Sequence, residues 1–304
     1  MGATLDIIRQ GFFNERRNTE AGMFNIRLKI FIAAILSFLI HQSSTAADSP
    51  RYISLAPSTT EILFALGLDS EIAAVSSFCD YPEAAGLKEK VGTFSQPNIE
   101  KILLLKPSYV FCTGLEQAEA VAGLKRLNLN VYVSDPKTID TLMKSILEIG
   151  EITGKFNQAK MLVERIKKEV SDIASKTAVI ARETRPKVFI EIWHSPLSTA
   201  GSGSFVDELI SIAGGRNIAF DVKRPYSIFS AEEVIRRDPD YIILAYMDKK
   251  TPVEIVKGRL GWGGISAVRN NRVYNDIDPN ILLRPGPRIA EAILEIYRRI
   301  RPNE

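Results

Sequence analysis

The chain has few of the residues on which active sites and metal centres most often depend. It contains only two histidines in 304 residues, and one of them, His41, falls in an N-terminal segment that we expect to be removed. The remaining histidine, His194, cannot by itself form a multi-histidine metal site. The Gly-Ser-rich stretch 201–204 lacks the Lys-Ser/Thr pair of a phosphate loop, so we interpret it as a turn and helix cap. No serine lies on an elbow motif, which argues against a hydrolase.

The chain also lacks an excess of either charge. Its 39 basic and 36 acidic residues give a net charge of +3, and no Lys/Arg run is interleaved with aromatic residues. We therefore expect no nucleic acid partner. The two cysteines, Cys79 and Cys112, both fall in the first half of the chain, near the ends of apolar runs. The sequence leaves open whether they form a disulfide or remain two buried thiols.

No hydrophobic run is long enough to span a membrane. The apolar run Ile30–Ile40 follows Arg27 and Lys29, and it is well short of the roughly 20 residues that a spanning helix needs. Small residues at Ala46 and Ala47 complete the pattern of a secretory signal peptide over residues 1–47. An uncleaved anchor is the alternative, and the long stretch before the apolar run leaves Met23 as an alternative start. We expect a soluble mature protein outside the cytoplasm, most simply in the periplasm.

One segment occurs twice, at residues 98–111 and 230–243. At one constant spacing Glu100 aligns with Glu232, and the prolines, tyrosines and flanking apolar residues of both copies also align. Each copy has the pattern of a helix that ends at a proline and is followed by a strand. Upstream, residues 60–67 and 207–214 are two further amphipathic helix patterns, each closed by a glycine. The repeats predict two similar lobes.

We therefore expect an α/β fold with two lobes, mostly parallel sheets flanked by helices, and a long rigid connector helix. The N-terminal lobe should cover residues 48–137, connector helices 138–185, and the C-terminal lobe 186–304. The connector rests on the run 155–181, which has no Gly or Pro and would be about 40 Å long as a helix. A helix packed on one lobe alone is the alternative.

Within this plan each lobe should open with a strand, a loop, a helix and a second strand. In the first lobe, Pro57-Ser58-Thr59 should form a turn that caps a helix at Thr60.

Aromatic and polar residues gather at the loops that follow the predicted strands, where α/β proteins bind ligands. They are Phe78, Tyr81 and Phe94 in the first lobe, Trp193, Tyr226 and Phe229 in the second, and Asn280 and Arg284 near the C-terminus. Two lobes with aromatic surfaces suit a large, flat, amphipathic ligand. The alternative is core packing, which is at least as well supported for Phe229. We interpret Trp262 as structural and His194 as a loop residue or hydrogen-bond donor.

The repeated glutamates predict a second surface. Glu100 and Glu232 should project from equivalent places on the two lobes, where a two-fold symmetric partner carrying arginines could be bound at two points. Glu61 and Glu208 are also paired by the repeat, and they could instead serve that role or cap their helices.

From Arg51 to Arg301 the sequence resembles the periplasmic substrate-binding proteins of ABC importers that have a helical connector. Within that family it is most similar to the vitamin B12-binding and other corrinoid-binding members. The segments that carry the resemblance are 54–61 (SLAPSTTE), 79–82 (CDYP), 98–102 (NIEKI), 205–209 (FVDEL) with 213–215 (AGG), and 284–288 (RPGPR).

The resemblance implies that Glu100 and Glu232 dock onto arginines of an inner-membrane permease dimer, which works with ATPase subunits. It also implies that Phe78, Phe94 and Tyr226 stand where the corrinoid binders place pocket aromatics. Asn280 stands where they have a pocket aspartate, and Thr113 replaces a pocket tryptophan.

The function implied is capture and delivery of a corrinoid, cobalamin or cobinamide, by a monomeric protein without catalysis, resident metal or cofactor. Haem or a ferric siderophore is the alternative ligand, because Tyr81, Tyr226, His194 and Arg284 could meet such a chelate. The family's rigid connector implies a small hinge movement.

Overall fold

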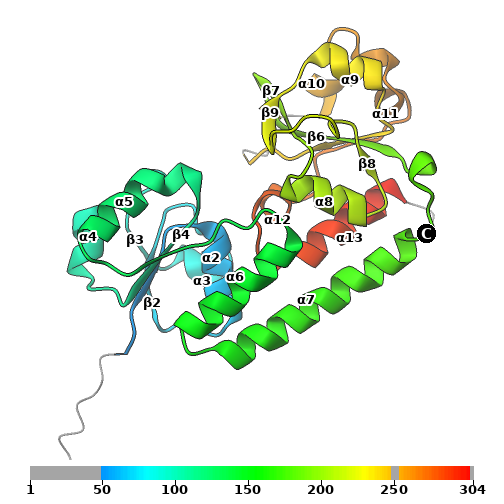
Figure 1. Cartoon of the computed structure of the whole chain (residues 1–304). Coiled ribbons are helices and arrows are strands. Elements are labelled where there is room, and N and C mark those ends of the chain that lie inside the picture. The colour runs from blue at the N-terminus through cyan, green and yellow to red at the C-terminus, as the bar shows by residue number, and fades with distance from the viewer. Residues whose placement is uncertain (1–48, 248–252, 302–304) are drawn as a thin grey trace, which may run out of the picture. The chain divides into compact units, whose positions relative to one another are not determined.

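The computed structural model describes residues 49–247 and 253–301, and the part from Pro50 onward forms one compact unit. The predicted signal segment, residues 1–47, lies outside the described residues. Within the described ranges, no helix is long and apolar enough to cross a membrane. The fold has two β-sheets, each flanked by helices, with two long helices between them in the sequence (Figure 1).

The N-terminal lobe contains a five-stranded sheet in which all neighbouring strands are parallel, in the order β3-β2-β1-β4-β5. Its strands are β1 (Tyr52–Ser54), β2 (Ile72–Val75), β3 (Glu89–Lys90), β4 (Tyr109–Cys112) and β5 (Val131–Val133). Its helices are α2 (Pro57–Ala65), α3 (Glu83–Gly86), α4 (Ile99–Leu104), the 3-10 helix η1 (Leu115–Gln117) and α5 (Ala118–Arg126). The central strand β1 is buried throughout, as expected for a parallel sheet covered by helices on both faces.

The C-terminal lobe contains a mixed sheet in the order β11-β10-β6-β7-β9, with β8 beside β6. Its strands are β6 (Lys187–His194), β7 (Leu197–Ala200), β8 (Arg216–Asn217), β9 (Tyr226–Ile228), β10 (Tyr241–Leu244) and β11 (Val273–Tyr274). Its helices are η2 (Arg182–Thr184), α8 (Phe205–Ile212), α9 (Ala231–Arg237), α10 (Val253–Lys257), η3 (Trp262–Gly264), α11 (Ser266–Arg269), α12 (Pro279–Leu283) and α13 (Ile289–Ile300).

The predicted opening of this second lobe is wrong. Strand β6 is followed directly by the antiparallel strand β7, and β9 adds a further antiparallel strand at the edge. Strand β7 has four residues and β9 has three. Such short segments do not show enough alternation of apolar and polar residues to be distinguished from a loop in the sequence.

Helices α6 (Ile139–Ile152) and α7 (Phe156–Thr177) form the connector. Thr138 and Thr141 make reciprocal capping hydrogen bonds at the start of α6, and Gly154 takes a left-handed conformation (φ 70°) between the two helices. Helix α6 packs on α2 of the first lobe, whereas α7 packs on α8 and α13 of the second. The buried face of α7 shares one continuous core with residues of both lobes, such as Ile62 and Leu209.

The sequence repeat is also a repeat of backbone geometry. Asn98 and Ser230 are the N-caps of α4 and α9, and each side chain accepts a hydrogen bond from the backbone three residues on. Lys106 and Asp238, at equivalent positions after the two helices, both have φ of 47°. The corresponding strands β4 and β10 then begin at the paired tyrosines. Glu100 and Glu232 therefore occupy the same position in two similar helices.

Two predictions about caps have different outcomes. Helix α2 begins at Pro57 with Ala56 as its N-cap, so the predicted turn at 57–59 is wrong. Proline is well tolerated at the first helical position because its missing N–H would have no intrahelical partner there. The predicted closing glycines are confirmed, since Gly67 and Gly214 have φ of 74° and 84°. The cap at 201–204 is confirmed as well, because Ser204 accepts a hydrogen bond from the Asp207 N–H.

Candidate functional site: an aromatic cleft and a docking surface

The candidate aromatic residues lie mostly in loops or at strand ends, with their rings accessible to solvent. Phe78, Tyr81, Trp193 and Tyr226 are exposed and Phe94 is half-buried. Phe229 is buried against Phe189 in the core of the second lobe, so for this residue the core alternative holds. Trp262 is fully buried, as its structural interpretation predicted.

Tyr226 lies at the start of the edge strand β9, within the electrostatic influence of two carboxylates of the other lobe. Although Tyr226 is 48% exposed, the protein atoms around its phenol partly exclude water, which raises its pKa, and the charges of Glu116 and Asp135 raise that pKa further. Glu116 follows β4 and Asp135 follows β5, so both come from the carboxyl ends of first-lobe strands. Asp135 packs closely on Gly114, where a Cβ atom would lie only 2.1 Å from its Oδ2. Sequence reasoning missed both carboxylates, although the rule that led to Phe78 would also have led to Asp135.

Phe94 is positioned by a buried amide. The Gln117 Nε2 donates to the Phe94 carbonyl at 2.7 Å and to the Leu55 carbonyl at 3.0 Å. Its Oε1 accepts the N–H of the half-buried Thr113 at 2.8 Å. Gln117 therefore ties the loop that carries Phe94 to the end of the central strand β1. No pattern in the sequence distinguishes this glutamine.

Arg284 is held by acidic residues of the first lobe. Its Nη1 donates to Asp80 Oδ1 at 2.6 Å and lies 3.8 Å from Glu61 Oε1. Its Nη2 donates to the Phe78 carbonyl at 3.4 Å. Although burial opposes the effect, the hydrogen bond and charge of Arg284 lower the pKa of Asp80. The positive charge of Arg284 is therefore largely compensated within the protein.

A second arginine, Arg288, forms an ion pair with Glu61, the buried carboxylate that also lies near Arg284. Its Nε and Nη2 donate to the two oxygens of Glu61, both at 2.8 Å. The guanidinium also stacks over the ring of Tyr81, 3.7 Å from the centroid. Burial raises the pKa of Glu61, and its pairing with Arg288 opposes that rise.

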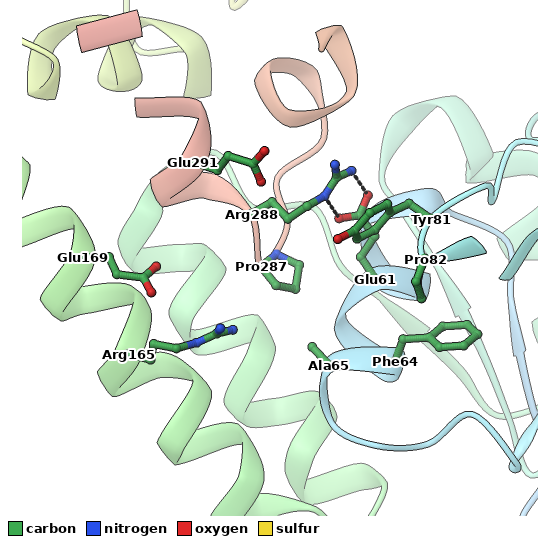
Figure 2. A pocket seen from close by; sticks show the side chains of 10 residues that line it. All are labelled: Glu61, Phe64, Ala65, Tyr81, Pro82, Arg165, Glu169, Pro287, Arg288 and Glu291. Atoms are coloured by element: carbon green, nitrogen blue, oxygen red, sulfur yellow. Dashed lines mark hydrogen bonds and ion pairs between the residues drawn. The ribbon is translucent and has the colours of Figure 1, made fainter. Parts of the chain in front are cut away.

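These groups form one wall of a pocket of about 440 Å³ (Figure 2). Helix α7 contributes Arg165 and Glu169 to another wall, and Glu291 of α13 completes the charged lining. Tyr81 thus lies against Arg288 at the edge of this pocket rather than standing free (Figure 2).

Trp193 and His194 end strand β6. The Trp193 indole N–H donates to the Ser195 carbonyl at 2.9 Å. The ring centroids of Trp193 and His194 lie 5.0 Å apart. Behind them the fully buried Glu191 accepts two hydrogen bonds from Arg259 and one from the Tyr246 hydroxyl. His194 also contacts the Tyr246 ring edge-on. Among the described residues, no group of three or more His, Cys, Asp or Glu side chains could hold a metal ion.

Asn280 is half-buried in α12, where its N–H donates to Asp278 Oδ1 at 3.1 Å. Asn280 lies four residues before Arg284, whose side chain forms the hydrogen bond to Asp80.

The candidate docking glutamates are exposed on both lobes. No hydrogen bond or ion pair forms at the Glu100 side chain in the described part of the chain, and Glu232 accepts one from Ser230 Oγ at 2.7 Å. The adjacent Glu233 is instead engaged by Arg236 and Arg237, which lower its pKa to about 2. Only one of the two neighbouring glutamates of α9 is therefore available to a partner.

The other repeated pair has internal roles. Glu61 binds Arg288, as described above, and Glu208 Oε2 accepts the Ile139 N–H at 2.8 Å. Glu208 thus caps the connector helix α6 rather than its own helix α8. Both carboxylates are engaged within the protein, so of the four repeated glutamates Glu100 and Glu232 stay the candidates for docking.

A family model described as periplasmic binding protein matches residues 53–279, most of the described chain. The chain belongs to this family. This binding protein is 34% identical over 269 residues to an uncharacterized ABC transporter substrate-binding lipoprotein of Bacillus subtilis, covering 86% of this chain and 84% of the relative. It is 31% identical over 214 residues to the vitamin B12-binding protein of Yersinia pestis, covering 70% and 75%.

Among solved structures, this binding protein matches the periplasmic vitamin B12-binding protein of Vibrio cholerae with a TM-score of 0.71 and 28% identity. The match covers 83% of this chain and 96% of that one. Members of the family bind small solutes, work with ABC permease and ATPase partners, and are not enzymes. The two-lobed α/β fold expected from the sequence is confirmed.

Proposed function

We propose that this binding protein captures a corrinoid between its lobes and delivers it to an ABC importer. The observation that carries the proposal is that exposed aromatic rings occur together with carboxylates: the charges of Glu116 and Asp135 act on Tyr226, and Phe78 and Phe94 belong to the same lobe as the two acids. A corrin ring is broad and apolar on its faces and bears amide arms at its edge. Aromatic rings stack on such faces, and carboxylates accept hydrogen bonds from amides.

The charges favour a corrinoid over an anionic chelate. Haem carries two carboxylates, and many ferric siderophores are anionic, so a site for either needs uncompensated cations. Arg284 is engaged by Asp80 and lies near Glu61, and Glu116 would repel a ligand carboxylate, whereas the charge of Asp135 is paired with Lys137 at 2.6 Å. Haem remains the second candidate because His194 is exposed beside Trp193 and could reach an iron atom.

The delivery route follows from the N-terminal segment and the two glutamates. The pattern at 1–47 supports export to the periplasm with cleavage near Ala46 or Ala47. Glu100 and Glu232, free of internal cation partners, support docking onto a permease dimer. No resident cofactor is part of the proposal, and the protein is proposed to act as a monomer.

Calorimetric titration of the purified protein tests the ligand. Cobalamin, cobinamide, haem and a ferric siderophore are titrated separately under one buffer condition. We expect submicromolar binding of a corrinoid and no binding of the siderophore. Binding of haem with no heat from either corrinoid would refute the proposal and support the second candidate.

A further inference from the structure

Each candidate docking glutamate has an exposed aliphatic neighbour one helical turn away. Leu103 is 38% exposed and Ile235 is 37% exposed, although both are large apolar residues. They follow Glu100 and Glu232 by three positions, so carboxylate and aliphatic side chain lie on the same face of each helix. The residues just before them, Ile102 and Val234, are fully buried. Each helix therefore has a side toward the core and an exposed side that carries the glutamate and the aliphatic residue.

The two exposed residues are equivalent members of the repeat. Their helices start from equivalent caps, Asn98 and Ser230, and end at the equivalent left-handed residues Lys106 and Asp238. The same side-chain pair is thus presented once by each lobe, by helices of matching geometry.

Neighbouring charges on both helices are engaged within their own lobe. Lys101 pairs with Glu89 at 3.1 Å and donates to the Lys90 carbonyl. In the second lobe Glu233 forms ion pairs with Arg236 and Arg237. Each helix therefore offers a partner a carboxylate that no cation compensates, with an aliphatic side chain on the same face.

Further apolar surface adjoins each of these pairs. Leu104 is exposed next to Leu103, and in the second lobe Ile235 lies close to Gly261. A Cβ on Gly261, which has φ of 80°, would lie 2.9 Å from Ile235 Cδ1. The residue before this glycine, Leu260, is also exposed. Exposed apolar groups that adjoin in this way are typical of protein interaction sites.

We propose that Leu103 and Ile235 are docking residues that insert into two apolar hollows of the permease dimer, each beside a cation that binds Glu100 or Glu232. This inference rests on the proposed function and deepens it by naming the second chemical component of the docking surface. The partner fitted by two equivalent pairs is a two-fold symmetric dimer. In this arrangement the glutamates set orientation and encounter rate, and the aliphatic side chains slow dissociation.

The test compares matched double variants of the full protein in binding to its own permease–ATPase complex in nanodiscs. Leu103→Ser with Ile235→Ser removes the apolar pair, and Glu100→Gln with Glu232→Gln removes the charged pair. Leu87→Ser with Met161→Ser is the control, because those side chains are more exposed, at 84% and 73%, and lie outside the repeat. Binding and stimulated ATPase activity are measured at low and high salt.

We expect the apolar double variant to dock at least about tenfold more weakly at both salt concentrations, because apolar burial is not screened. The glutamate variant should lose most of its affinity at low salt and approach wild type at high salt. Wild-type docking by the Leu103/Ile235 variant would overturn the inference, as would an equal loss in the control.

Two further measurements separate the inference from its premises. Calorimetry with cobalamin should give the same affinity for wild type and all variants. If the wild-type protein does not bind a corrinoid, the proposed ligand is refuted, but the comparison of docking between variants still stands. Sedimentation should give one monomeric species for every variant. A wild-type dimer dispersed by the serines would mean that the aliphatic residues pair two copies of this chain, which would overturn the permease as their partner.

Discussion

Arg288 and Glu61 form a bidentate ion pair between the start of α13 and helix α2 of the first lobe, with both hydrogen bonds at 2.8 Å. Glu61 is buried, so its carboxylate has little access to water. Its counterpart in the repeat, Glu208, binds the first amide of the connector helix. Two glutamates at equivalent places thus tie their own lobe to a different part of the chain.

Removing one partner of the Glu61–Arg288 pair should be strongly destabilising. Glu61→Ala removes both short hydrogen bonds of the partly buried Arg288 and leaves it the more distant Asp278, 3.7 Å from its Nη1, as a counter-charge. Breaking a buried pair on one side typically costs about 3–5 kcal/mol. Urea unfolding should show this loss, whereas Glu100→Ala, at an exposed site, should stay within about 0.5 kcal/mol of wild type. Glu61→Leu combined with Arg288→Met should recover much of the loss, because neither member of the buried pair is then left without the other. Additive losses in that double variant would contradict a direct pair.

The Asp80–Arg284 bridge should make stability depend on pH in the acid range. Because the folded protein lowers the pKa of Asp80 from its usual 3.8, the unfolded chain takes up the proton first as pH falls. The contribution is therefore complete above that usual value and is lost as pH falls through the lowered one. Urea midpoints at pH 5 and pH 3 should differ more in wild type than in Asp80→Asn. Glu164→Gln, at an exposed site on α7, is the control, and equal pH responses in all three proteins would exclude the bridge.

Glu208→Ala should weaken the start of the connector. The Ile139 N–H would lose its acceptor at the first turn of α6, at a cost of about 1–2 kcal/mol. Hydrogen exchange should therefore accelerate at Ile139 while remaining unchanged in the centre of α7. Glu151→Ala, at the exposed end of α6, is the matched control. Unchanged exchange at Ile139 would show that the Thr138 cap alone is sufficient.

The features that the sequence predicted well are those set by neighbours along the chain. Asn98 and Ser230 cap their helices through hydrogen bonds that span three residues, and Pro107 and Pro239 mark the helix ends. Such signals are local, so the repeat, the strands β4 and β10 and the connector helices could be predicted from short windows.

The interactions that the sequence could not predict join distant residues. Asp80 and Arg284 are 204 residues apart, and Glu61 and Arg288 are 227 residues apart. No local pattern pairs them, and the short strand β7 that interrupts the expected order of the second lobe carries too few residues to be recognised. The sequence therefore predicts Arg284 as a ligand residue without indicating its acidic partners, Asp80 and Glu61. Its role in the ligand site stays a prediction.

Cys79 and Cys112 should behave as two protected thiols. Both are free and buried, the Thr60 hydroxyl donates to Cys79 Sγ at 3.1 Å, and burial raises the pKa of Cys112 to about 12. Since the thiolate is the reactive form, a thiol reagent at pH 8 should label neither cysteine in the folded protein. In urea without reductant it should label both. Labelling in urea only after reduction would instead reveal a disulfide.

The candidate ligand-binding rings of Phe94 and Tyr226 should contribute to ligand affinity without supporting the fold. Phe94→Ala and Tyr226→Ala should each weaken cobalamin binding about fivefold or more, since a lost stacking surface typically costs about 1 kcal/mol. Tyr226→Phe keeps the ring and should retain most of the affinity. Gln117→Leu should also weaken binding, because Phe94 loses the amide that holds its backbone at 2.7 Å.

Phe156→Ala is the control for these cleft variants, because Phe156 is an exposed aromatic residue on the connector, at the start of α7. Calorimetry measures affinity, and urea midpoints verify that each variant is folded. Wild-type affinity in both Phe94→Ala and Tyr226→Ala would remove these rings from the binding surface. Weaker binding in Phe156→Ala as well would point to a general effect on lobe geometry. We expect cobalamin affinity to fall in Phe94→Ala and Tyr226→Ala and to stay unchanged in Phe156→Ala. That pattern is expected if the ligand stacks on rings of both lobes.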